Sequence, residues 1–287
     1  MIKNIIFFIE FLLIRILFLV LNLLPLNISS KIVSIFFKFF GQLTKNHKIA
    51  IKNCKHVFPT LPDEEIKTIV FKSWENLGKT ILELGMLKKI FNYKMIETNG
   101  IDNISSIIEK KIPAIYFSIH HSNWEICVPF LDRMEIKVGA IYRHINNHFL
   151  NKFVLKRRVD SLKTNKSFYT PKGQQSAKDI LDAVKKNKSI FLLIDQKDSA
   201  GEEVILFNKS IKTQTGFLKI ARKYNMPIVP MENRRLKNGK FLINFHKPIF
   251  HTSNDSDNDM MKKIHNIIEK WILNNPNQWF WQHNRFN

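Results

Sequence analysis

The feature that most constrains the fold is a buried strand that leads directly into a polar turn and then into a helix. Residues 112–118 are apolar and rich in β-branched and aromatic side chains, as is typical of a buried strand. Residues 123–134 carry apolar side chains at helical spacing, and Ser122 or Asn123 is a suitable N-cap. Polar side chains at such a strand-to-helix turn can project into a cleft.

Two side chains of this turn carry acid–base chemistry. His120 and Glu125 flank four residues. A neutral imidazole can take a proton from a hydroxyl while a nearby carboxylate holds its tautomer and stabilises the imidazolium. We therefore predict His120 as the general base and Glu125 as its partner. His121 is the rival base but should point elsewhere on the turn, and Asn123 either caps the helix or donates to an oxyanion.

The segment around this pair has a wider resemblance, although a histidine and a glutamate at this spacing also occur together by chance. The pattern His-x-x-Asn-Trp-Glu at 120–125 resembles the His-x4-Asp/Glu box of the lysophospholipid-acyltransferase superfamily. It is most similar to the late acyltransferases of lipid A biosynthesis. Further segments resemble that family in the same order, namely residues 53–66, 142–158, 195–230 and 276–286. Departures at Ile119, His121, Asn284 and the acidic stretch 195–203 bear on acyl-chain and acceptor choice.

This resemblance implies a set of roles for residues beyond the turn. It implies that Arg158 contacts substrate phosphate or supports the site, and a guanidinium suits phosphate because it binds in a bidentate way. Arg143 matches a family position too, although it can equally be a solvated charge. Asp195 follows an apolar run at 189–194, where open α/β sheets place functional side chains. It is expected to position Arg158 or the acceptor, or to cap a loop.

The resemblance also implies the reaction and its partners. It implies an O-acyltransferase that moves a fatty acyl group from acyl carrier protein to a hydroxyl of a Kdo-bearing lipid A precursor. No metal and no cofactor are expected. His144 and His148 lie at i, i+4 but have no third ligand nearby and lack a His-Glu-x-x-His pattern. A Gly-x-Ser-x-Gly elbow is also missing, which argues against a serine hydrolase.

The charge of the chain is strongly positive, at +21 over 287 residues. Residues 137–172 contain nine Lys or Arg against one acid, Asp160. Such a stretch attracts an anionic partner. Nucleic acid is disfavoured because zinc-finger spacing, an aromatic–basic RNA motif and a basic recognition helix are all missing. Anionic lipid headgroups, sugar phosphates and an acidic carrier protein fit better.

The N-terminal sequence predicts a membrane anchor. Residues 5–26 form an apolar run, interrupted by Glu10, Arg15, Asn22 and Pro25, that is long enough to cross a bilayer. A buried core helix is the alternative, and the internal charges argue against a cleavable signal peptide. Residues 30–40 resemble an amphipathic interfacial helix. We expect an anchor at 1–28 and an acyltransferase domain at 29–287, on the cytoplasmic face of a bacterial inner membrane.

The rest of the chain alternates between strand and helix patterns after a helical region at 44–94 that is interrupted at Pro59 and Pro62. This alternation predicts an α/β fold with a mixed β-sheet flanked by helices, similar to the glycerolipid acyltransferases. The expected strands are 114–119, 138–142, 190–194, 204–207, 227–231 and 241–245, and the expected helices 147–159, 174–186, 215–224 and 257–273.

Two other functions stay open at this stage. A related enzyme would acylate another lysophospholipid or glycolipid, although the terminal Trp, His and Arg residues argue mildly against a glycerolipid enzyme. A binding protein on a decayed acyltransferase scaffold is disfavoured because His120, Glu125, Arg158 and Asp195 are all present. Trp279, Trp281 and Phe286 are expected to pack the C-terminal tail, from which His283 and Arg285 could reach the acceptor.

Overall fold

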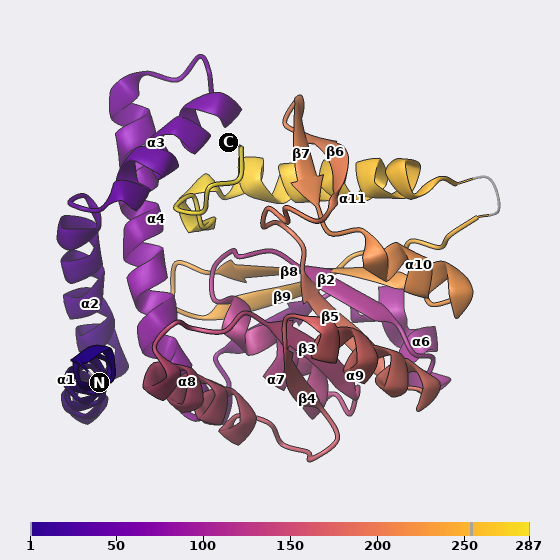
Figure 1. The fold of residues 1–287 in the computed structure, drawn as a ribbon, viewed down its shortest axis with the longest axis horizontal. Helices are drawn as coiled ribbons and strands as arrows, with labels where there is room; N and C mark the ends of the chain where they lie inside the picture. The colour runs from indigo at the N-terminus through magenta and orange to yellow at the C-terminus, as the bar shows by residue number, and fades with distance from the viewer. Residues whose placement is uncertain (1, 253–254, 287) are drawn as a thin grey trace.

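A seven-stranded mixed sheet forms the centre of the computed structural model, which describes residues 2–252 and 255–286 (Figure 1). The strand order is β1-β9-β8-β2-β5-β3-β4. Strands β8, β2, β5, β3 and β4 are parallel to one another, whereas β9 runs antiparallel to β8 and pairs in parallel with β1. The strands are β1 (Ile96–Asn99), β2 (Ile115–Ser118), β3 (Val138–Tyr142), β4 (Phe168–Pro171), β5 (Ser189–Leu193), β8 (Ile228–Arg235) and β9 (Phe241–Phe245).

Strand β2 is buried on both faces, because helices cover the sheet on both sides. Ile115 and Phe117 point into one apolar cluster, while Tyr116 points into the other. A parallel strand covered on both faces reads as a continuous apolar run, which is why residues 112–118 have that composition. The mixed α/β fold predicted from the sequence is therefore confirmed.

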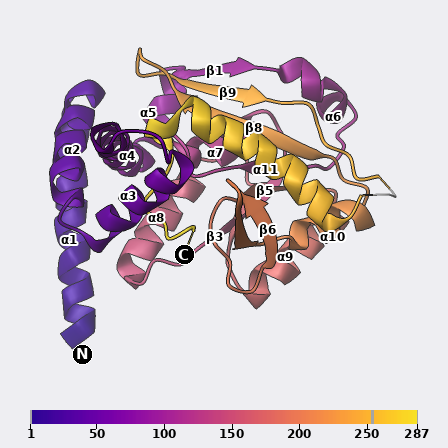
Figure 2. The ribbon, with the colours of Figure 1, turned by 90° about the horizontal axis from the view of Figure 1, so that it is seen from above.

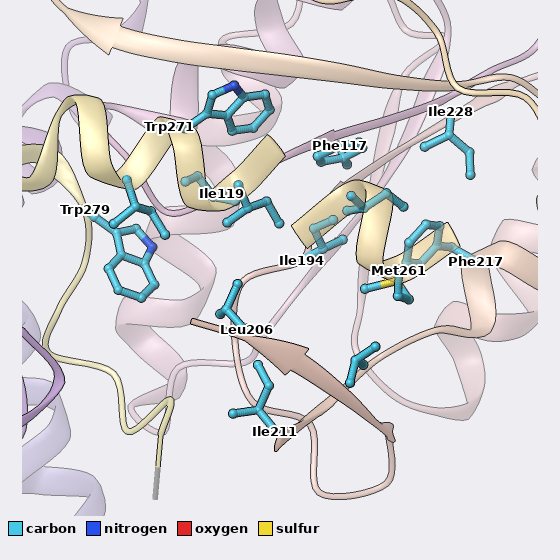
Figure 3. Close-up of a cluster of buried hydrophobic side chains, with 14 of the residues drawn as sticks. Phe117, Ile119, Ile194, Leu206, Ile211, Phe217, Ile228, Met261, Trp271 and Trp279 are labelled. Carbon is cyan, nitrogen blue, oxygen red and sulfur yellow. The ribbon is translucent and has the colours of Figure 1, made fainter. Parts of the chain in front are cut away.

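The larger cluster lies between β2 and the elements that cover it on one side (Figure 3). Helices α9 (Gln174–Lys185), α10 (Gly216–Lys223) and α11 (Asp257–Asn274) contribute to it, together with part of α3 (Lys45–Val57) and α4 (Asp63–Leu84). The second cluster includes α5 (Leu87–Asn92), α6 (Ser105–Glu109) and α7 (Cys127–Arg133).

A two-stranded hairpin stands apart from the main sheet. Strand β6 (Glu202–Leu206) pairs with β7 (Lys209–Thr213), and Figure 1 shows the hairpin beside α11. Phe207 and Asn208 in the loop both have positive φ, as a two-residue type I′ turn requires. The strand predicted at 204–207 thus exists, but its partner is β7 rather than the central sheet.

Two N-terminal helices lie along one side of the molecule, α1 (Ile2–Leu23) and α2 (Leu26–Gly41) (Figures 1 and 2). Within the described residues, α1 is the one helix long and apolar enough to cross a membrane by length and composition. Helix α2 packs along α4, and α1 packs against α8 (His148–Asp160).

Most of the expected elements are present with small shifts at their ends. The predicted helix at 123–134 begins as a short 3-10 turn, Trp124–Ile126, before α7. Three strands were not predicted, namely β1, β4 and β7. Each has only four or five residues, and its identity as a strand depends on pairing with a partner, which for β1 is the distant β9, for β4 is β3 and for β7 is the neighbouring β6.

Candidate active site

His120 and Asp195 meet at the carboxyl edge of the parallel sheet. Ser118 at the end of β2 is in register with Leu193 at the end of β5, so each of the two functional residues lies two positions beyond its strand. His120 Nδ1 donates to Asp195 Oδ1 over 2.7 Å, and the backbone N–H of His120 donates to Oδ2 over 3.0 Å. The open edge of a parallel α/β sheet is a common place for a functional site.

The Asp195 carboxylate is buried and fully engaged. A third donor, Trp279 Nε1, lies 2.8 Å from Oδ2. Burial acts to raise the pKa of this carboxyl, but His120 and the donors outweigh it and lower the pKa to about 2. An ionised carboxylate can only accept, so the proton of His120 lies on Nδ1 and the lone pair on Nε2. Nε2 is therefore the atom able to remove a proton.

Glu125 does not make the contact with His120 Nδ1 that the sequence predicts. Its two carboxylate oxygens instead accept from Arg158 Nε over 2.8 Å and from Nη2 over 2.6 Å. The expected link between Asp195 and Arg158 is likewise replaced by the Glu125–Arg158 pair. The reason lies in the sheet: adjacent parallel strands bring residue 195 beside residue 120, whereas Glu125 lies in the 3-10 turn and faces α8.

The Glu125–Arg158 pair is a buried ion pair next to the histidine. Burial opposes ionisation of Glu125, but the charge and hydrogen bonds of Arg158, and also His120, lower its pKa. Burial also acts to lower the pKa of Arg158, but Glu125 outweighs it and raises that pKa. Both groups stay charged, and the Arg158 guanidinium lies 5.8 Å from the Tyr142 ring centroid at the end of β3.

Arg143 is exposed and belongs to neither pair. Burial lowers the pKa of His283 to about 4, and the positive charge of Arg143 contributes to this shift. Arg143 therefore lies near the C-terminal part of the site, and its role in binding stays a prediction.

His121 points in a different direction from His120, as expected from its adjacent position on the turn. It is buried, with Nδ1 2.9 Å from the Asn233 carbonyl oxygen and Nε2 2.9 Å from that of Asn275. Both ring nitrogens face backbone, which leaves His120 as the accessible imidazole. Asn123 caps the turn, because its Oδ1 accepts from the Glu125 N–H over 3.1 Å.

The C-terminal tail contributes more to the site than packing. Trp279 donates to Asp195, and the Phe280 N–H donates to the His120 carbonyl over 2.9 Å. Arg285, which the sequence suggested could reach the acceptor, is buried and donates to the Lys212 carbonyl and to Thr213 Oγ1. Burial lowers its pKa to about 10 although the Asp195 charge opposes the shift, so Arg285 is a structural cation that anchors the tail to β7.

A polar stripe on α4 was missed by sequence reasoning. Ser73 Oγ donates to the Trp279 carbonyl over 2.6 Å, and Thr80 Oγ1 donates to the Ser122 carbonyl over 2.7 Å. Asn76 and Glu83 continue the stripe, and all four are buried. Polar residues at a spacing of three and four on an otherwise apolar helix face were the available signal. The stripe joins the turn of His120 to the C-terminal tail.

Over residues 2–252 and 255–286, no three His, Cys, Asp or Glu side chains gather in a way that could hold a metal ion. The site therefore consists of an imidazole held by one carboxylate and, next to it, a guanidinium held by another. An imidazole held in this way can take a proton from a hydroxyl by general-base chemistry.

Comparison with known proteins names the family. The model for bacterial lipid A biosynthesis acyltransferases matches residues 3–287, and the chain belongs to this family. Its relatives include a lipid A biosynthesis lauroyltransferase of Escherichia coli K12, 24% identical over 253 residues, which span 85% of this chain and 80% of the relative. A lipid A biosynthesis palmitoleoyltransferase of the same organism is 22% identical over 259 residues, or 85% and 79% of the two chains. The protein is thus an acyltransferase of lipid A biosynthesis.

Proposed function

We propose that the protein transfers a fatty acyl group from acyl carrier protein to a hydroxyl of a (Kdo)2-lipid A precursor, with His120 as general base. The observation that supports this best is the bond from His120 Nδ1 to the buried, ionised Asp195, which leaves the basic lone pair on Nε2. Asp195 takes the positioning role that the sequence assigned to Glu125.

In this mechanism the acceptor hydroxyl oxygen attacks the thioester carbonyl while His120 Nε2 removes its proton. The carbon–sulfur bond then breaks, and the imidazolium returns the proton to the leaving thiolate. The product is an ester and a free thiol. The buried negative charge of Asp195 stabilises the imidazolium that forms between these two steps.

Arg158 is proposed to bind the anionic part of a substrate. Glu125 occupies Nε and Nη2 and so fixes the guanidinium plane, while the Nη1 edge can donate to phosphate. Glu125 then acts by positioning Arg158. Arg143, exposed beside His283, is proposed to add a second positive charge for the same anion.

The wider charge pattern supports the partners. The nine Lys and Arg residues of 137–172, which include Arg158, lie in or next to β3, α8 and β4. An acidic carrier protein and the phosphates and carboxylates of the acceptor would both be attracted there. We further propose that residues 1–28 anchor the acyltransferase domain, 29–287, to the cytoplasmic face of the inner membrane.

The test is transfer of a labelled acyl group from acyl carrier protein to a purified tetra-acylated, Kdo-bearing lipid A precursor. Wild type should transfer the label, and His120→Ala should lose about three or more orders of magnitude in kcat. His144→Ala, an exposed histidine outside the site, is the matched control and should be unaffected. Turnover only on a lysophospholipid or another glycolipid would contradict the proposed acceptor and keep the His120 chemistry.

A further inference from the structure

We propose that α1 does not cross the membrane but lies in the plane of one leaflet, together with α2. The outward halves of α1 and α2 form one surface, which we call the apolar platform. This platform contacts the acyl chains of an anionic lipid leaflet. This inference rests on the proposed membrane location. It does not depend on which acyl donor or which lipid acceptor the enzyme uses.

Both ends of α1 are bonded to the globular body. Near its start, Asn147 Nδ2 donates to the Phe7 carbonyl over 2.8 Å and to Glu10 Oε2 over 3.0 Å. Near its end, Lys89 Nζ donates to the Asn22 carbonyl over 3.0 Å. At roughly 1.5 Å per residue, Phe7 and Asn22 are about 22 Å apart along the helix. The globular body therefore lies against α1 over most of the length that a membrane-spanning helix would need, which is about 30 Å.

Aromatic contacts fill the interval between those two ends. The ring of Phe11 lies 5.9 Å from that of Phe149, and the ring of Phe18 lies 5.8 Å from that of Phe153. Phe18 also lies directly against Gly85, where a Cβ would approach its ring to 2.5 Å. Helix α1 is thus seated on α8 and on the end of α4 rather than projecting from the molecule.

The neighbouring helix α8 cannot enter hydrocarbon beside α1 without bringing charge with it. It carries Lys152, Lys156, Arg157 and Asp160, and Lys152 and Lys156 are exposed. Charged side chains inside the bilayer core are strongly disfavoured. A spanning α1 would pull these residues into the core, whereas an α1 in the plane of the interface leaves them at headgroup depth.

The polar residues of α1 lie on the half that faces the body. Phe7, Phe11 and Phe18 define the inward direction, since each contacts α8 or α4. With about 100° per residue, every polar side chain of the helix falls within about 80° of that direction. These side chains are Lys3, Asn4, Glu10, Arg15 and Asn22. The opposite half is entirely apolar, which is the pattern of a helix that lies in an interface.

Helix α2 forms the other part of the apolar platform. Ser29 Oγ donates to the Leu21 carbonyl over 2.6 Å and joins the two helices. Figure 1 shows α1 end-on beside α2, and Figure 2 shows α1 lengthwise along the same side of the molecule. Leu13 and Ile16 of α1 and Ile35 and Phe39 of α2 are all more than half exposed.

Basic side chains lie beside the apolar platform. Lys31 and Lys38 of α2 are exposed near Ile35, and the basic side chains of α8 adjoin α1. Cationic side chains beside an outward apolar face favour anionic lipid, which the basic groups would meet at the headgroups. Because α8 also carries Arg158, the acyl chains of a lipid acceptor would lie beside the site without leaving the leaflet.

The test measures depth along α1 in the full-length protein. Single cysteines at Ile5, Leu13 and Val20, all on the outward half, are labelled with nitroxide in vesicles of phosphatidylglycerol and phosphatidylethanolamine. Collision with oxygen and with a water-soluble nickel complex then reports immersion. Cys54 and Cys127 are buried and stay in place, and Lys178→Cys, at an exposed position of α9, is the aqueous control.

Equal depth at the three positions is the expected result. A spanning helix would place position 13 about 12 Å deeper than position 5, at roughly 1.5 Å per residue, and that gradient would overturn the proposal. Exposure of all three labels to water would overturn the proposal and the membrane location together. Acyl transfer, measured separately on wild type, tells these failures from a failure of the proposed reaction.

Discussion

Glu83 of α4 and Arg235 of β8 form a buried, bidentate ion pair behind the turn that carries His120. Arg235 Nη1 and Nη2 lie 2.5 and 2.8 Å from the two carboxylate oxygens. Glu83 Oε2 also accepts from Asn123 Nδ2 over 2.9 Å. Arg235 Nε donates to Asn76, whose own amide donates to the Ser122 carbonyl over 3.1 Å. The pair thereby fixes two successive residues of the turn.

Removing one member of this pair should destabilise the protein strongly. Glu83→Gln leaves Arg235 buried without a counter-charge, at a cost of about 3–5 kcal/mol in the free energy of unfolding. The double variant Glu83→Gln with Arg235→Met should lose less than the sum of the two single variants, because neither charge is left alone. Thermal unfolding of the four proteins in detergent measures this coupling.

A surface pair provides the matched control. Lys240 and Glu97 lie 3.1 Å apart, and each side chain is 46% exposed. Lys240→Ala should cost no more than about 1 kcal/mol. Additive losses at Glu83 and Arg235 would show that the buried pair does not act as a unit.

Asp195→Asn should lower kcat more than Glu125→Gln does. An asparagine cannot accept at both positions, so its amide N–H meets either His120 Nδ1 or the two donors at Oδ2. We expect kcat to fall about 10³- to 10⁴-fold as the Nδ1–H tautomer is lost. Nitrogen chemical shifts of a ¹⁵N-histidine-labelled protein report that tautomer directly.

Glu125→Gln should instead act through Arg158. It removes the only carboxylate that the Arg158 guanidinium contacts within the described residues, so stability should fall by about 3–5 kcal/mol while the His120 tautomer is retained. A change of tautomer in this variant, with none in Asp195→Asn, would return the orienting role to Glu125.

Trp279→Phe and Trp281→Phe make a matched pair. Both indoles are buried; Trp279 Nε1 donates to Asp195 over 2.8 Å, and Trp281 Nε1 donates to the Pro276 carbonyl over 2.7 Å. A hydrogen bond to a charged group contributes about 1.5–3 kcal/mol. Only Trp279→Phe should therefore lower kcat, about 10- to 100-fold, and it should also lose more stability than Trp281→Phe, whose bond is to a neutral carbonyl. Equal kcat values for the two variants would remove Trp279 from the site.

The chemistry-bearing residues of the site were more predictable than their pairing. His120, Glu125, Arg158 and Asp195 are recognisable from residue type and position after strands, and they do lie together. Which carboxylate meets His120 depends on β5 lying next to β2, a tertiary fact that no local spacing contains. The predicted pairing followed sequence proximity and was therefore wrong.

The contribution of the C-terminal tail to the site could not be predicted from the sequence, for a related reason. The apolar and aromatic residues at 279–286 predict packing, which the structure confirms, since Trp279, Trp281 and Phe286 are buried. The bond from Trp279 to Asp195 depends on where α3 and α4 hold the tail, through Asn53 to the Trp281 carbonyl and Ser73 to the Trp279 carbonyl. These contacts join residues more than 200 positions apart.

The stability of the protein should fall in mild acid because of a buried histidine outside the site. His265 of α11 is 1% exposed, with Nδ1 2.6 Å from the Ile205 carbonyl oxygen. Burial lowers its pKa to about 4, although the bond to Ile205 opposes the shift. Between about pH 6.5 and 4 the unfolded chain binds a proton at this residue that the folded chain does not. Stability is therefore lost as pH falls through that window, by up to about 3 kcal/mol.

His265→Gln should flatten this dependence. The glutamine amide can still donate to the Ile205 carbonyl but does not titrate, so the melting temperature should fall less between pH 6.5 and 4 than in wild type. His283, whose pKa burial also lowers to about 4, leaves a residual slope of the same sign. His144→Gln, at an exposed position, should keep the wild-type slope. An unchanged slope in His265→Gln would mean that the imidazole is already protonated in the folded state or is hydrated there.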